Sequence, residues 1–416
     1  MNFKSLVFIF VTLLCGQHAV AGTWADASAV TAAGTRNYRV WIPNGYQPGS
    51  ALPMILMVHG CTQNPTDFAA GTQMNALADE YKFFAVYPEQ PSSANGSNCW
   101  NWFETAHQAR AAGEPSILAR IVADVRAGYS IRADKIYAAG MSAGAAMTVI
   151  LGATYPDLFA GIGVCAGLEY RAGTDVVSGV LAQEVGGPDP NAQGRLAFNE
   201  MGTRARRMPT IVFHGTLDVT VQPVNGTQVF QQWAQTNDLI DDGFDNNSVD
   251  AVAEQTVPGM VPNGRAYTRS VYHDAANRPL IEFWSIEQMR HAWSGGSSAG
   301  SYTDPTGPSA SREMVRFFAL DLAPSASGAT LGGRVTSADG RGLANVIVTV
   351  SGGGGSSQAR PRSVRTNSFG QYRFARLPTG ASYQVSVSSK RYSFAVPLQT
   401  VSLNEDFFDA DFVGAQ

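Results

Sequence analysis

Gly-Met-Ser-Ala-Gly at residues 140–144 is the stretch that decides the fold. Before it, residues 135–139 (Lys-Ile-Tyr-Ala-Ala) are typical of a short buried strand, and after it residues 145–151 (Ala-Ala-Met-Thr-Val-Ile-Leu) are typical of a buried helix. A G-x-S-x-G at a strand-to-helix turn is a nucleophile elbow, whose small flanking residues allow a strained turn that holds the serine hydroxyl clear of the sheet. The alternative is a glycine-rich turn with an incidental serine, which this context disfavours. Ser142 is therefore the candidate nucleophile.

Two later segments supply an acid and a base in the chain order of an α/β-hydrolase, which is serine, acid, histidine. Residues 209–213 read as a strand that opens into a loop carrying Asp218, and residues 279–286 read as another strand, followed by His291. Serine is a weak nucleophile, so it needs a base within hydrogen-bond reach, and the base needs an acid to orient it. The order predicts a triad of Ser142, His291 and Asp218.

The other histidines fit structural roles better. His18 lies in a segment that we expect to be removed, and His273 comes one strand too early to be the base. His59 and His214 each end an apolar strand directly before a glycine, where a histidine usually satisfies backbone groups. His107 lies in a polar stretch and is expected to be solvated.

Acyl transfer also needs N–H donors for the developing oxyanion. In a nucleophile elbow one donor is the amide of the residue after the serine, here Ala143. The second should come from the loop after an early central strand, and residues 53–58 form such a strand before His-Gly-Cys at 59–61. The Cys61 amide is the candidate, the alternative being a purely structural loop.

Five motifs, taken in order, resemble the poly(3-hydroxybutyrate) depolymerase family of esterases, which is related to feruloyl and acetylxylan esterases. They are His-Gly-Cys-Thr-Gln at 59–63, Asn-Cys-Trp-Asn-Trp-Phe at 98–103, Gly-Met-Ser-Ala-Gly-Ala-Ala-Met at 140–147, His-Gly-Thr-Leu-Asp at 214–218 and His-Ala-Trp at 291–293. The resemblance covers roughly residues 35–320 and implies an α/β-hydrolase fold with a mostly parallel sheet.

The same resemblance implies Ser142 as nucleophile, His291 as base, Asp218 as its orienter, and the Cys61 and Ala143 amides as the oxyanion hole. It does not fix the substrate, because the family divides between polyesters and plant cell-wall esters. Val-Cys-Ala-Gly at 164–167 departs from the family, whose members more often have a Ser-Gly turn there.

Composition fits an exported globular enzyme. The 416 residues exceed one compact domain, 44% are hydrophobic and only 15% are charged. A net charge of −4 gives no reason to expect nucleic acid or an anionic membrane as partner. The sequence shows no Cys/His spacing suited to a metal and no phosphate-binding loop, so we expect no metal and no cofactor.

Residues 1–21 read as a secretory signal peptide. Lys4 precedes an apolar run at 6–14 that is too short to span a bilayer, and Ala-Val-Ala at 19–21 gives a small-x-small cleavage site. A lipoprotein signal at Cys15 is disfavoured by the bulky residue before it. We expect a secreted protein, either periplasmic or extracellular.

Export to an oxidising compartment favours a disulfide among the remaining cysteines. Cys61 and Cys99 both lie in loops that follow early strands, the second strand being residues 83–87, whereas Cys165 lies at a buried strand. We predict a Cys61–Cys99 bridge, which would fasten the oxyanion loop, and a buried free thiol at Cys165.

Three tryptophans near these motifs are candidates for substrate binding. Trp100 and Trp102 stand among Asn and Phe on a loop, and Trp293 follows the candidate base. We interpret Trp100 and Trp102 as a substrate wall, with ordinary core packing as the alternative.

The remaining pattern of the esterase region, residues 22–323, alternates strands and helices, which predicts a mostly parallel sheet covered on both faces. Residues 38–42 read as an early antiparallel strand, 116–129 as a helix with a serine cap, and 311–320 as a closing helix. The acidic stretch 238–250 lacks an apolar period and the spacing of a calcium loop, so it reads as a solvated insertion.

After a small-residue linker at 324–330, residues 331–416 show strands and turns without helices. Strands are expected at 331–335, 346–350 and 383–387, with a Gly/Ser/Arg-rich loop at 352–365. The pattern resembles the carboxypeptidase regulatory-like, prealbumin-type β-sandwich. The module could anchor the enzyme to insoluble polymer, or it could be a spacer whose aromatic residues form its own core.

The sequence thus predicts a secreted serine esterase acting on a polymeric or oligomeric ester, foremost a poly(3-hydroxybutyrate)-type polyester. A feruloyl or acetylxylan esterase is the alternative of the same class. A non-catalytic binding or adhesion protein acting through the C-terminal module is the alternative of another class, and the complete triad argues against it.

Overall fold

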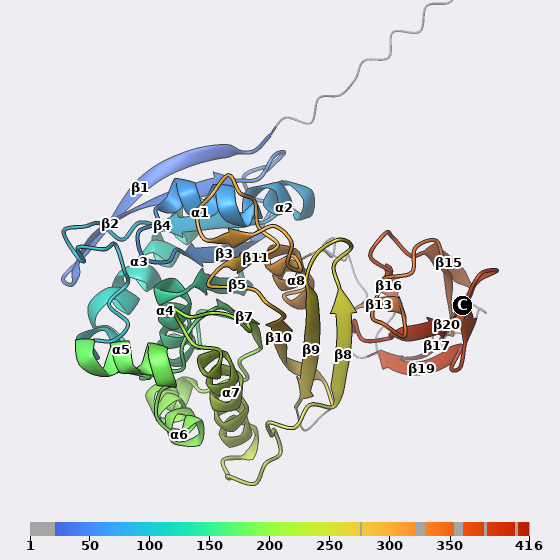
Figure 1. The fold of residues 1–416 in the computed structure, drawn as a ribbon. Helices are drawn as coiled ribbons and strands as arrows, with labels where there is room; N and C mark the ends of the chain where they lie inside the picture. The colour runs from blue at the N-terminus through green and yellow to red at the C-terminus, as the bar shows by residue number, and fades with distance from the viewer. Residues whose placement is uncertain are drawn as a thin grey trace, which may run out of the picture.

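A ten-stranded sheet forms the centre of the larger domain (Figure 1), with the strand order β1-β2-β4-β3-β5-β6-β7-β10-β9-β8. The computed structural model describes residues 21–274, 277–320, 329–352, 361–377, 381–403 and 407–415; the expected signal peptide lies almost wholly outside these residues. The six strands from β4 to β10 in that order run parallel, and antiparallel pairs flank them at both edges. The strands are β1 (Thr23–Thr31), β2 (Gly34–Ile42), β3 (Leu52–Val58), β4 (Phe84–Pro88), β5 (Ile131–Met141), β6 (Ile162–Cys165), β7 (Thr210–Gly215), β8 (Gln255–Met260), β9 (Ala266–His273) and β10 (Pro279–Ile286), with a separate small pair β11 (Trp293–Ser294) and β12 (Thr303–Asp304).

Helices cover both faces of this sheet, as predicted. The helices are α1 (Pro65–Thr72), α2 (Met74–Tyr81), α3 (Gly113–Gly128), α4 (Ala143–Thr154), α5 (Val176–Val185), α6 (Pro190–Met201), α7 (Val224–Asp242) and α8 (Ala310–Phe317), with 3-10 turns η1 (Thr105–His107) and η2 (Gly202–Arg204). One core cluster joins a face of the sheet to α3, α4, α6 and α7, and a second joins the other face to α1, α2 and α8. The central strands are almost continuously apolar because both of their faces are buried.

Two details of the larger domain differ from the sequence prediction. Helix α3 begins at Gly113, and Ser116 is not its cap, because its hydroxyl donates to the Gly113 carbonyl within the first turn. The acidic stretch 238–250 is not wholly solvated, because α7 continues to Asp242 and buries Asp238. The Asp238 carboxylate accepts hydrogen bonds from the loop that follows, which accounts for an acid in a buried position.

The C-terminal module is a β-sandwich of two four-stranded sheets, with the orders β16-β13-β20-β18 and β15-β14-β17-β19. The strands are β13 (Ala329–Ser337), β14 (Ile347–Gly352), β15 (Arg362–Arg365), β16 (Gln371–Leu377), β17 (Ala381–Ser388), β18 (Ser393–Phe394), β19 (Leu398–Leu403) and β20 (Phe412–Ala415). Strand β15 lies inside the predicted 352–365 loop because it pairs with β14, and β13 begins within the predicted linker. Residues 324–328 of that linker lie outside the described residues.

Polar contacts join the module to β9, the neighbour of the edge strand β8; the module lies beside β8 in Figure 1. The Arg269 guanidinium is 3.6 Å from the Asp409 carboxylate and 3.3 Å from that of Glu282. The Arg334 guanidinium is 3.4 Å from the Tyr267 hydroxyl. Because Arg269 is nearly buried between two carboxylates, these contacts fix the module against the esterase domain. In the ranges the structure describes, no helix is both long and apolar enough to cross a membrane.

Candidate active site

The turn between β5 and α4 holds Ser142 in a strained conformation, with φ 55° and ψ −124°. Two glycines make this turn possible. A Cβ at Gly140 would lie 2.4 Å from the Gly144 carbonyl oxygen, and a Cβ at Gly144 would lie 2.1 Å from the carbonyl oxygen of Val58. Both approaches are too close for any side chain, so G-x-S-x-G is a steric requirement here.

Asp218 and His291 meet at the same end of the sheet as Ser142. Asp218 follows β7 and His291 follows β10, and these strands run parallel to β5 and β6 as close neighbours in the sheet. The carboxyl ends of parallel strands share one edge, so the loops after them converge. His291 Nδ1 lies 2.7 Å from Asp218 Oδ2.

Asp218 is built to remain ionised. It is 1% exposed, and its Oδ1 accepts hydrogen bonds of 2.9 Å from the amides of Thr220 and Val221. Burial raises the pKa of Asp218, but the hydrogen bond from His291 and the backbone donors outweigh it, so the net shift is downward. A charged Asp218 accepts the His291 Nδ1 proton, which leaves Nε2 as the basic atom.

Cys165 joins the serine turn to the histidine loop. Its backbone carbonyl accepts a 2.9 Å hydrogen bond from the Ser142 amide, and its thiol lies 3.4 Å from the carbonyl oxygen of Ala292. The thiol is fully buried, and burial raises its pKa to about 12. Cys165 is the buried free thiol that the sequence predicted.

The competing histidines have structural roles, as predicted for His59 and His214. Nε2 of His59 accepts from the Gln90 amide at 3.1 Å, and burial lowers its pKa to about 4. His214 Nε2 lies 2.8 Å from the Val221 carbonyl, within the Asp218 loop, and burial lowers its pKa. The prediction of a solvated His107 is wrong, because its Nδ1 accepts a 2.9 Å hydrogen bond from the backbone amide that opens α3.

The loop after β3 lies against the serine turn. A Cβ at Gly60 would lie 3.4 Å from Ser142 Cβ, which is van der Waals distance, so the two turns are direct neighbours. Among the described residues, the amides of Cys61 and Ala143 have no hydrogen-bond acceptor. The Ala143 amide also stands in the first turn of α4, whose dipole favours negative charge.

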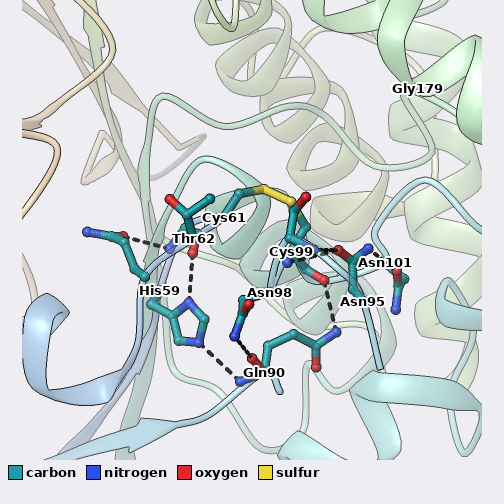
Figure 2. The surroundings of a disulfide bond; sticks show 12 residues. His59, Cys61, Thr62, Gln90, Asn95, Asn98, Cys99, Asn101 and Gly179 are labelled. Atoms are coloured by element: carbon teal, nitrogen blue, oxygen red, sulfur yellow. Dashed lines mark hydrogen bonds between the residues drawn. A yellow bond between two sulfur atoms is a disulfide. The ribbon is translucent and has the colours of Figure 1, made fainter. Parts of the chain in front are cut away.

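A disulfide joins Cys61 to Cys99, as predicted, with a Cα–Cα distance of 4.1 Å (Figure 2). The same two loops are tied by backbone and side-chain bonds. The Thr62 amide donates to the Ser97 carbonyl at 2.7 Å, and the Gln90 backbone amide donates to His59 Nε2 at 3.1 Å. The loop that carries the Cys61 amide is therefore held on both sides.

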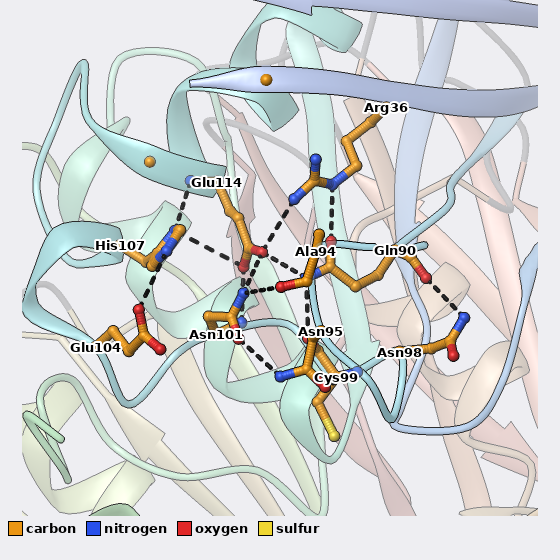
Figure 3. A network of polar contacts seen from close by, with 12 residues as sticks. Arg36, Gln90, Ala94, Asn95, Asn98, Cys99, Asn101, Glu104, His107 and Glu114 are labelled. Carbon is orange, nitrogen blue, oxygen red and sulfur yellow. Dashed lines mark hydrogen bonds and ion pairs between the residues drawn. The ribbon is translucent and has the colours of Figure 1, made fainter. Parts of the chain in front are cut away.

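A buried carboxylate, Glu114, organises the loop around Cys99 (Figure 3). Its Oε2 accepts from the Asn101 amide at 2.7 Å, and its Oε1 accepts from the Asn101 side chain at 2.8 Å. The Arg36 guanidinium balances the charge at 3.2 Å. Sequence reasoning missed Glu114, because nothing in its local pattern identifies partners on β2 and on the loop before η1.

The predicted tryptophan wall is absent from the surface. Trp100 is 0% exposed, Trp102 is 4% exposed and Trp293 is 1% exposed, so all three belong to the core. Trp293 packs edge-on against Phe68, and its Nε1 donates to the Ser311 hydroxyl at 3.1 Å. These three side chains are therefore core residues, which was the alternative to a substrate wall. Glu114 ties down the loop that carries Trp100 and Trp102, and this accounts for the burial of two tryptophans near the site.

Over the part of the chain that the structure describes, His, Cys, Asp and Glu side chains form no group of three placed to hold a metal ion.

Comparison with known proteins agrees with this geometry. Residues 36–255 match the family described as "Esterase PHB depolymerase", and residues 330–412 match the "Carboxypeptidase regulatory-like domain". Poly(3-hydroxyalkanoate) depolymerase C of Paucimonas lemoignei is 32% identical over 252 residues, covering 60% of this chain and 56% of that protein. Acetylxylan esterase A of Talaromyces purpureogenus is 28% identical, covering 56% of this chain and 65% of that protein.

The matches therefore span somewhat more than half the length of these two relatives. Among solved structures, an acetyl xylan esterase from Aspergillus awamori aligns with a TM-score of 0.56 at 20% identity, covering 71% of this chain and 99% of that one. The structural likeness supports the α/β-hydrolase fold.

Proposed function

Because this chain belongs to the esterase PHB depolymerase family, we propose that it is a serine carboxylic-ester hydrolase with a triad of Ser142, His291 and Asp218. The observation that carries the proposal is the 2.7 Å bond between His291 Nδ1 and a buried, ionised Asp218, at the sheet edge where the strained Ser142 stands. A binding protein with no chemistry to perform would gain nothing from that strain.

The proposed reaction follows from these positions. His291 Nε2 takes the proton of the Ser142 hydroxyl as Oγ attacks the ester carbonyl, and a tetrahedral oxyanion forms. The unpartnered amides of Cys61 and Ala143 donate to that oxygen. The imidazolium, stabilised by Asp218, protonates the departing alcohol as the ester C–O bond breaks, which leaves the acyl group on Ser142 Oγ. Water then gives a proton to His291 and attacks the acyl carbon, and the acid leaves as Ser142 Oγ takes the proton back.

We assign the substrate to the aliphatic hydroxyalkanoate polyesters and their oligomers, with acetylated or feruloylated plant polysaccharide as the second candidate. Both classes occur among the relatives' names, so the family alone does not choose between them. We also propose that the protein is exported, because the Cys61–Cys99 bridge suits an oxidising compartment.

One experiment separates the two substrate classes. The purified chain is incubated with a poly(3-hydroxybutyrate) film, acetylated xylan and feruloylated arabinoxylan, and released hydroxybutyrate, acetate and ferulate are measured. The Ser142→Ala variant serves as the enzyme blank. We expect release from the film to exceed release from both polysaccharides. Release from a polysaccharide alone would transfer the assignment to the cell-wall esterases, and equal release by the Ser142→Ala variant would refute the triad.

A further inference from the structure

An aliphatic patch covers α5 and the loop that carries Asp218. Its side chains are 40% to 79% exposed, although each is a valine or leucine. The members of this patch are Val176, Val177, Val180, Leu181, Val185, Leu217, Val219 and Val224. Isolated exposed apolar side chains are common, but here they gather on one helix and on the segment 217–224, which the hydrogen bond from Gln222 to Gln183 joins to that helix, and such a grouping marks an interaction surface.

Helix α5 is inverted relative to an ordinary surface helix, which turns its branched apolar residues toward the core. Here the residues that α5 buries are the small Gly179 and Ala182. A Cβ at Gly179 would lie 2.7 Å from Phe103 Cβ, so the helix is pressed closely onto the loop after Cys99. A capping box between Asp175 and Ser178 fixes its first turn. The valines are therefore held outward on a rigid support.

The patch is continuous with the candidate active site. Leu217 and Val219 directly flank Asp218, and the Gln222 amide joins their loop to α5 by donating to the Gln183 carbonyl at 2.8 Å. Gly179 of α5 packs against Phe103, in the loop that follows Cys99. A surface seated on this patch would meet the site at its rim.

We propose that the aliphatic patch docks an insoluble, uncharged aliphatic polyester, an inference that rests on the proposed esterase function and chooses its substrate class. The only charged residue within α5 itself is Glu184, so the helix offers no cation to an anionic surface. A polysaccharide would bury hydroxyl groups against valine and leucine, which provide no hydrogen bonds. An aliphatic polyester presents mainly hydrocarbon and matches the patch.

In the described part of the C-terminal module, three of the strand aromatics are withdrawn from the surface. Tyr372, Phe374 and Tyr383 are each 6% exposed or less and pack in the core of the sandwich. Adsorption through the patch therefore places the polymer directly at the candidate active site and needs no contribution from those rings.

Adsorption without turnover tests the proposal. In the Ser142→Ala background, binding to poly(3-hydroxybutyrate) granules and to xylan particles is measured by depletion of protein from solution. Val177→Gln combined with Leu181→Gln alters the patch. Val30→Gln combined with Val252→Gln is the matched control, because these valines are 64% and 71% exposed, within the range of the patch, but lie on β1 and on the segment before β8. Thermal unfolding shows that each variant is folded.

We expect the patch variant to lose several-fold in binding to the granules while the control pair binds as the parent does. In the Ser142 background, the ratio of granule hydrolysis to soluble-ester hydrolysis should fall by a similar factor. The proposal would be overturned if the patch variant bound the granules as well as the control variant does. It would also be overturned if the patch variant lost as much binding to xylan as to the granules. Conversion of a dimer to a monomer with unchanged granule binding would assign the patch to a second copy of the chain. If the protein bound granules through the patch but had no esterase activity, the docking proposal would be supported and the proposed catalysis would be refuted.

Discussion

The two sides of the candidate active site are built on opposite principles. On one side, the loop around Cys99 is tied by a disulfide and by the buried Glu114, and its two tryptophans are withdrawn into the core. On the other side, α5 buries small residues and leaves its valines exposed. Aromatic residues close to a catalytic motif are therefore no guide to the surface that a substrate meets; the local backbone ties decide which side chains face outward.

The largest expected effect is a loss of catalysis when Asp218 is changed, because its loop carries part of the exposed aliphatic patch and also holds the candidate base. Asp218→Asn keeps the Oδ1 acceptor for the Thr220 and Val221 amides but places an NH2 group opposite His291 Nδ1. His291 would then adopt the wrong tautomer, and kcat for a soluble ester should fall about 10⁴-fold. Asp238→Asn is the matched control, because Asp238 is an equally buried acid that holds a loop elsewhere. Comparable losses in both variants would contradict a catalytic role for Asp218.

On the side tied by the disulfide and by Glu114, substitutions should lower the free energy of unfolding strongly. Glu114→Ala removes the carboxylate that pairs with the buried Arg36 guanidinium, which keeps the neutral acceptor Gln90 Oε1, and it frees the Asn101 amide. Breaking a buried pair in this way costs about 3–5 kcal/mol, measured by urea unfolding. Asp124→Ala on the same helix removes an exposed pair with Arg120 and should cost less than about 1 kcal/mol. Equal costs for the two variants would show that the network around Glu114 is not a support.

Removal of the disulfide tests the same side by another route. Cys61→Ser combined with Cys99→Ser should lower the free energy of unfolding by about 2–4 kcal/mol. Esterase activity should also fall, because the amide at position 61 loses its tether and with it the preorganisation of a donor. Val177→Gln, on the exposed side, provides the contrast, since stability there should hardly change. Full soluble-ester activity without the bridge would refute the role proposed for this tether.

The effect that is smallest at pH 5, and that grows only as the pH rises, concerns Glu169, in the segment that leads from β6 to α5. Within the described residues its two carboxylate oxygens have no partner, and burial raises its pKa to about 9. Between pH 4.5 and 9 the folded chain holds a proton that the unfolded chain releases, so this group's contribution to stability declines as pH rises. Glu169→Gln cannot ionise, so its stability relative to the unmodified protein should increase by roughly 1 kcal/mol per pH unit. Urea unfolding at pH 5, 7 and 8.5 measures the difference, and a constant difference would contradict it.

Patterns that depend on neighbours in the chain were predictable from the sequence. The serine turn, the alternation of strands and helices, and the order of Ser142, Asp218 and His291 all rest on local periodicity and on the shared edge of parallel strands. The Cys61–Cys99 pairing was predictable because both loops follow adjacent strands. Each of these expectations needs only the topology of the sheet.

Features that depend on packing between distant segments were not predictable. Glu114 reads as an ordinary acid at a helix start, and its burial depends on Arg36 and Asn101 arriving from other elements. The direction in which α5 faces is likewise set by contact of Gly179 with Phe103. The prediction that Trp100 and Trp102 form a substrate wall was wrong for the same reason.

The burial of Cys165 has a consequence for how the chain acquires its covalent connectivity. Cys61, Cys99 and Cys165 permit three alternative pairings in an oxidising medium, and thiol–disulfide exchange could interconvert them. Exchange requires an accessible thiolate, but in the folded protein Cys165 is enclosed and its pKa is raised to about 12. Once the sheet has closed around β6, the third cysteine no longer competes, and the correct bridge is kinetically locked. Scrambling is thereby confined to chains that have not yet folded.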